Sequence, residues 1–72
     1  MKNEKIEEIM TEAVEKAYTV QSEETLSQLG SAKEAAQSAI DDIDYSEVDG
    51  MTEKEAYDFY YDWALDCIAS VL

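Results

Sequence analysis

The chain has 72 residues and carries 18 acidic side chains against five lysines, with no arginine and no histidine, so its formal net charge is −13. This length allows one acidic helical domain, over residues 1–72, near the lower size limit for an independent hydrophobic core. Hydrophobic residues make up 46% of the chain, which excludes the apolar-poor composition of a disordered protein.

The acidic residues are spread along the whole chain. The net charge is −4 over residues 1–30, −5 over residues 31–50 and −4 over residues 51–72. The folded body, not a tail, is therefore expected to be the polyanion, although self-repulsion on this scale destabilises a compact state. The absence of proline and the presence of only two glycines predict long helices.

The first predicted helix covers about residues 3–20. Its apolar residues recur at spacings of three and four, which is typical of one buried stripe on a helix. The stripe consists of Ile6, Ile9, Met10, Ala13, Val14 and Ala17.

The second predicted helix covers about residues 22–44. Ser22 followed by two glutamates is a suitable N-terminus, because a serine hydroxyl caps the first turn and acids favour the positive end of the helix dipole. Gly30 lies inside this segment, and Ser31 with Glu34 fits a second capping box. We expect one helix with a weak point at Gly30; two separate helices are the alternative.

The third predicted helix covers about residues 52–71. Asp49 and Gly50 mark a turn, and Thr52 with Glu55 fits a capping box at the start of the helix. Three amphipathic helices joined by short links predict an all-α fold, a small three-helix bundle.

The third helix has more apolar surface than a bundle of this size readily covers. We expect its core arc to contain Ala56, Tyr60, Trp63 and Cys67, with a flank of Tyr57, Tyr61, Leu65 and Leu72 and an acidic ribbon of Glu55, Asp58, Asp62 and Asp66. Three interpretations remain open: a central helix buried on two sides, a homodimer seam, or a site for another protein.

The sequence lacks the residues of common active sites, and we expect no enzyme, cofactor or metal site. Histidine and arginine are absent, and Cys67 is expected to be a buried, inert thiol. The segment from Asp42 to Glu53 partly matches a calcium-binding EF-hand loop. However, Glu47 stands where that loop requires glycine, so we expect only loose cation association.

In size and charge the chain resembles small acidic proteins of bacteriophages and mobile elements that act as DNA mimics, in anti-CRISPR or anti-restriction roles. The resemblance is compositional and involves no motif. It implies an inhibitor that occupies the basic, nucleic-acid-binding site of a host defence protein and does not itself bind nucleic acid. We expect the partner-binding residues on the last helix: Glu55, Asp58, Asp62, Asp66, Tyr57, Tyr61 and Leu65.

Two alternative functions are a homo-oligomeric structural or regulatory module, which uses the aromatic face of the last helix, and a calcium-responsive module. The sequence also predicts a cytoplasmic protein, in the host cell if a phage encodes it. No run of about 18 apolar residues is present, and the N-terminus lacks the apolar core of a signal peptide. A surface rich in carboxylates is repelled by anionic lipid, and a single cysteine fits a reducing compartment.

Overall fold

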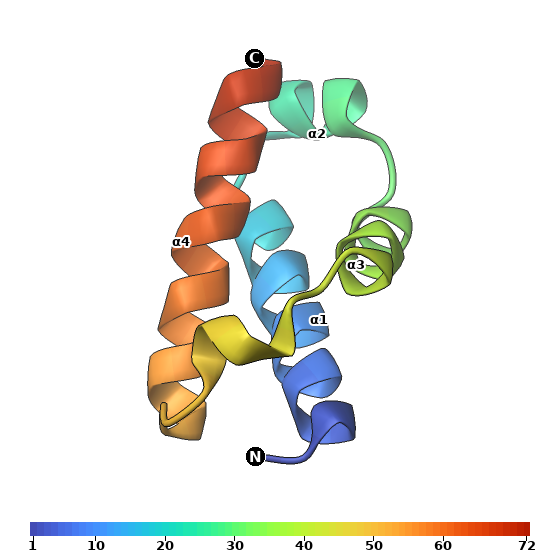
Figure 1. Cartoon of the computed structure of the whole chain (residues 1–72). Coiled ribbons are helices and arrows are strands. Elements are labelled where there is room, and N and C mark those ends of the chain that lie inside the picture. The colour runs from blue at the N-terminus through green and yellow to red at the C-terminus, as the bar shows by residue number, and fades with distance from the viewer.

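Helix α1 (Asn3–Thr19) is the element against which the rest of the chain packs. The computed structural model describes all residues from 1 to 72 and contains helices only (Figure 1). After α1 come α2 (Glu23–Leu29), α3 (Ala32–Asp41), the 3₁₀ helix η1 (Tyr45–Val48) and α4 (Glu53–Val71). The all-α bundle expected from the sequence is therefore confirmed, with a larger number of helices.

The predicted apolar stripe of α1 is confirmed, because all six of its residues are buried. Helices α3 and α4 both pack on α1, whereas α3 and α4 barely touch each other. Small side chains let the helix axes approach closely: Ala13 and Ala17 on α1 and Ala56 on α4 have no exposed surface. Since α1 supports helices on two sides, it occupies the central position that one interpretation of the sequence gave to the last helix.

The middle of the chain folds as two helices, so the expected single helix over residues 22–44 is wrong and its alternative is correct. Gly30 ends α2 with φ 81° and ψ −151°, a backbone conformation that is almost exclusive to glycine. Ser22 caps α2 by accepting a hydrogen bond from the backbone N–H of Thr25. Ser31 caps α3 by accepting a hydrogen bond of 3.4 Å from the backbone N–H of Glu34.

The predicted capping box at the start of α4 is confirmed. The Thr52 hydroxyl accepts a hydrogen bond of 3.2 Å from the Glu55 N–H, and the Glu55 carboxylate accepts one of 3.1 Å from the Thr52 N–H. Gly50 turns the chain into α4 with φ 82°. An exposed ion pair of 3.0 Å between Lys5 and Glu53 then connects the first turns of α1 and α4.

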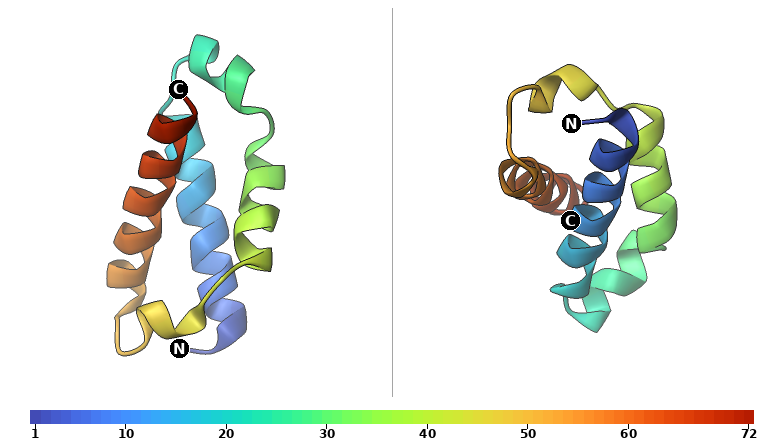
Figure 2. Two further views of the ribbon diagram at one scale, coloured as in Figure 1. Left: turned by 45° about the horizontal axis from the view of Figure 1, so that its top comes forward. Right: turned by 90° about the horizontal axis from the view of Figure 1, so that it is seen from below.

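The other four elements form an open frame around α1. In Figure 1, α4 and α3 stand on either side of α1. Helix α2, which connects α1 with α3, lies at the end of the frame near the C-terminus, and η1, which connects α3 with α4, crosses the other end. The two further views in Figure 2 show the same separation of α3 from α4. The frame measures 37 × 19 × 17 Å, and only 12 residues, five of them alanines, are buried. None of its helices has the length and apolar character needed to cross a bilayer.

The sign of the stability change in a Gly30→Ala variant tests the break between α2 and α3. Alanine at φ 81° costs about 1–3 kcal/mol of unfolding free energy, although a Cβ there meets no other atom. A continuous helix would instead gain about 1 kcal/mol from the same change. Urea denaturation followed by circular dichroism measures the difference. A more stable variant would contradict the break.

Candidate functional site

The separation of α3 from α4 leaves an apolar groove whose floor is α1. Its volume is about 360 Å³, and 14 of its 18 lining residues are hydrophobic. The main contributions are Met10 and Val14 from α1, Ala35 and Ala39 from α3, Ile43 from the following loop, and Phe59, Trp63, Cys67 and Val71 from α4. This volume lies in the range of known ligand-binding clefts, and concave apolar surfaces are the usual sites of recognition.

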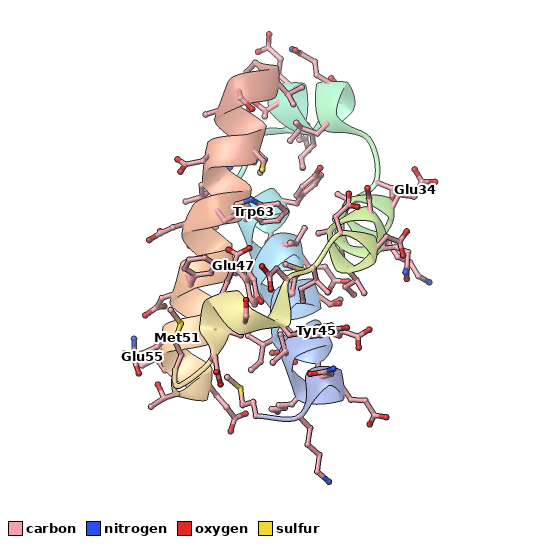
Figure 3. All side chains as sticks on the ribbon, viewed as in Figure 1. Glu34, Tyr45, Glu47, Met51, Glu55 and Trp63 are labelled. Carbon is pink, nitrogen blue, oxygen red and sulfur yellow. The ribbon has the colours of Figure 1, made fainter.

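Trp63 and Cys67 lie on the wall of this groove, not in the core as the sequence suggested. Trp63 is 41% exposed and the Cys67 thiol is exposed, so the expectation of a buried thiol is wrong. Figure 3 shows Trp63 at the opening between α4 and α3. The reason is that α4 packs mainly on α1, and the side of α4 that is buried carries Ala56, Tyr60, Ala64 and Ile68. The Trp63 edge is left toward the open side of the frame.

The end of the groove next to η1 combines a buried hydroxyl with carboxylates. Tyr60 is 3% exposed, and its hydroxyl has no hydrogen-bond partner. Burial, followed by the negative charges of Glu47 and Asp44 and the neighbouring Tyr45, raises the pKa of the Tyr60 hydroxyl. Both carboxylates line the same groove, and Figure 3 shows Glu47 at its opening.

The local structure of η1 fixes the position of one of these carboxylates. The Asp44 carboxylate caps η1 by accepting hydrogen bonds from the Ser46 N–H at 3.0 Å and from the Ser46 hydroxyl at 2.6 Å. These hydrogen bonds stabilise the charged form and lower the pKa of Asp44. The carboxylate is therefore ionised at neutral pH and held at the end of the groove.

The predicted acidic ribbon of α4 is exposed, but its four members differ in their contacts. Glu55 serves in the capping box, and Asp58 forms an ion pair of 3.0 Å with Lys54. Asp62 and Asp66 have no lysine within 4.0 Å. Asp66, three residues after Trp63, lies next to it on the helix surface, whereas Asp62, one residue before it, lies about 100° away around the helix. The Asp66 end of the ribbon is therefore the part nearest to the groove.

The predicted aromatic flank lies on the other side of the ribbon and is half-buried. Tyr57, Tyr61 and Leu65 pack against the core, and the two tyrosine rings stack with their centroids 6.3 Å apart. These side chains leave less apolar surface free than the sequence pattern suggested. The largest exposed aromatic surface on α4 belongs to Trp63 instead.

Most of the carboxylates on the surface are uncompensated. Of the 18 acids, Glu8, Glu53 and Asp58 lie within 4.0 Å of a lysine amino group, which leaves 15 without an ion pair. No charged residue is buried. The negative charge is therefore presented to solvent on every helix.

The segment that partly matches a calcium loop has another structure. Asp44 caps η1, and Glu53 lies in the first turn of α4, paired with Lys5. No three acidic or cysteine side chains gather closely enough to hold a metal ion. The loop between α3 and α4 therefore shows no assembled set of calcium ligands.

The groove itself was not predicted from the sequence. The periodicity of α4 indicated too much apolar surface, which was the available signal, but no local sequence pattern shows that α3 and α4 hardly touch each other. Comparison of the chain with models of protein families, with curated proteins and with solved structures found no match.

Alkylation of Cys67 tests the position of the groove wall. We expect neutral N-ethylmaleimide to modify Cys67 in the folded protein at a rate within about tenfold of that in urea, because the thiol is exposed. Mass spectrometry at several times measures both rates. Modification that proceeds only in urea would show that Cys67 is buried in the core of the folded protein.

A Tyr60→Phe variant tests the unpartnered hydroxyl. Removal of a buried hydroxyl without a partner is expected to raise the unfolding free energy by about 1 kcal/mol at pH 7. Because the folded state holds the Tyr60 proton more tightly than the unfolded chain, its stability falls as the pH rises above the usual tyrosine pKa of 10.0. Urea titrations at pH 7 and above pH 10 measure both effects. Tyr61→Phe is the control, and a less stable Tyr60→Phe protein at pH 7 would contradict this account.

Proposed function

We propose that this chain is a non-enzymatic binding protein that occupies the basic, nucleic-acid-binding surface of another protein and so inhibits it. One observation supports the proposal above the others: 15 carboxylates on a helical body have no ion-pair partner, and all of them except the half-buried Glu7 are exposed. Solubility alone requires a net charge of magnitude about 2–8 for a small domain, which the formal charge of −13 exceeds.

The spacing of the acids suits a surface that normally binds phosphates. Successive acids at i, i+4 on α4, such as Asp58, Asp62 and Asp66, rise by about 6 Å along the helix axis. A nucleic-acid-binding channel lines up lysines and arginines to neutralise closely spaced phosphates. A rigid row of carboxylates competes for the same cations, and the field of the whole protein speeds the encounter.

The aromatic residues then supply the binding energy that charge does not. Charged groups at an interface mainly set the association rate and the orientation, whereas buried aromatic residues contribute most of the affinity. Tyr57, Tyr61 and Leu65 contribute to this role through the surface that they leave exposed, and Trp63 adds a larger exposed area beside Asp66. The proposed interface therefore covers the outer side of α4.

Capture of the target from the native host, with competition by DNA, tests the proposed function. The immobilised protein is expected to retain a basic nucleic-acid-binding protein that elutes at moderate salt and that duplex DNA displaces. The triple variant Asp58→Lys, Asp62→Lys, Asp66→Lys is expected to bind this target at least about a hundredfold more weakly, because each charge reversal replaces attraction by repulsion.

A matched control distinguishes the contribution of the acidic ribbon to binding from that of the net charge. The variant Glu23→Lys, Glu24→Lys, Glu34→Lys changes the net charge by the same amount on α2 and α3. It is expected to weaken binding far less than the α4 variant. A captured target that binds DNA and this protein at the same time would contradict the proposal, as would equal losses in the two variants.

A further inference from the structure

We infer that the groove between α3 and α4 binds a basic amphipathic helix of the partner protein, with apolar side chains over Trp63 and a lysine or arginine at the Tyr60 end. The inference rests on the proposed function in one respect, the basic character of the partner. It adds the part of the partner that is recognised and a site on this chain that lies beside the acidic ribbon and shares Trp63 with the proposed interface.

The lining of the groove divides into two chemically different ends. The end near the C-terminus of α4 is apolar and is lined by Cys67 and Val71 of α4, Leu29 of α2 and Tyr18 of α1. The opposite end carries the negative charge, because the acids that line the groove are Asp42 at the end of α3, Asp44 at the cap of η1 and Glu47 within η1. An occupant that matches both ends has an apolar face and a cationic group beside it.

The carboxylates of Asp44 and Glu47 mark where the cationic group binds. Both are exposed and line the groove beside Tyr60, whose own hydroxyl is enclosed within the chain. A lysine or arginine N–H donates a charge-assisted hydrogen bond to such a carboxylate. The aliphatic part of such a side chain lies well against apolar walls while its charged head reaches the carboxylates.

The length and placement of the groove favour a helix as the occupant. Its α4 wall runs from Phe59 to Val71, about 18 Å along the helix axis, which corresponds to about three turns of a partner helix. Helices α3, α1 and α4 already occupy three positions of a bundle, and the open position lies between α3 and α4 (Figure 2). Amphipathic helices bind apolar grooves of this kind through residues at i, i+3, i+4 and i+7.

A designed peptide tests the inference directly. The probe is a peptide of leucine and lysine, about four turns long, with its leucines on one helical face. Trp63 is the only tryptophan of the chain, so its fluorescence reports occupation of the groove. We expect a saturable blue shift as the peptide covers the indole, and at least about tenfold weaker binding by the same peptide with glutamine in place of lysine.

Variants of the groove make the result specific. Glu47→Gln is expected to weaken peptide binding by about tenfold, since a charge-assisted hydrogen bond is lost, whereas Glu24→Gln on α2, outside the groove, leaves it unchanged. Ala39→Phe fills the groove from α3 and is expected to abolish the shift. Ala69→Phe, at an exposed position of α4, adds the same bulk outside the groove and retains the shift.

Several results would overturn the inference. These are peptide binding without a change in Trp63 fluorescence, equal affinities of the Glu47→Gln and Glu24→Gln variants, and a shift that persists in Ala39→Phe. A response to dodecylammonium in the absence of any response to the peptide would assign the groove to a small amphiphilic cation instead.

The captured target separates this inference from the proposed function. If Ala39→Phe and Glu47→Gln bind the target normally while the charge-reversed α4 variant does not, the groove inference fails and the proposed function stands. If neither the groove variants nor the charge-reversed variant loses target binding, both fail. Loss of binding in both kinds of variant supports both.

Discussion

The apolar face of α1 holds this structure together, because α3 and α4 pack on it and hardly on each other. Six residues of α1 form half of the buried core, and alanines at the helix contacts bring α4 close. A chain with one such supporting face cannot close into a symmetrical three-helix bundle. The groove, the exposure of Trp63 and the unpartnered hydroxyl of Tyr60 all follow from this single packing arrangement.

The distribution of charge is consistent with a small hydrophobic core. All charged side chains remain at the surface, so no ion pair has to be buried, and the three ion pairs present are exposed and contribute little stability. Repulsion among 15 unpaired carboxylates opposes compaction and also opposes association of two identical copies. A partner of opposite charge relieves this repulsion. The unpaired carboxylates that destabilise the isolated fold therefore favour the binding of a basic surface.

The sequence predicted those features that depend on neighbouring residues. The stripe of α1 follows from spacings of three and four, and the start of α4 follows from the pairing of Thr52 with Glu55; both predictions are confirmed. The division at Gly30 was recognised as an alternative but not preferred, because glycine is tolerated inside helices at about 1 kcal/mol. The conformation of Gly30, φ 81°, decides the matter, and no local pattern specifies it uniquely.

The orientation of α4 was less predictable, because it depends on helices far away in the chain. The periodicity gave an apolar arc that includes Tyr60, Trp63 and Cys67, but it did not indicate which edge of the arc meets α1. In a closed bundle the whole arc is covered. Here Ala64 and Ile68 are buried, whereas Trp63 and Cys67 are exposed on the wall of the groove. The exposed surface of α4 therefore differs from the predicted one by the addition of Trp63 and the partial burial of Tyr61.

Quenching of Trp63 fluorescence by acrylamide tests the open arrangement of the helices most directly. Acrylamide is neutral, so the negative charge of the protein does not exclude it, and Trp63 is the only tryptophan. A side chain that is 41% exposed on a groove wall predicts emission at long wavelength and efficient quenching in the folded protein. Emission at short wavelength that acrylamide quenches only after unfolding would place Trp63 in a closed core and contradict the account.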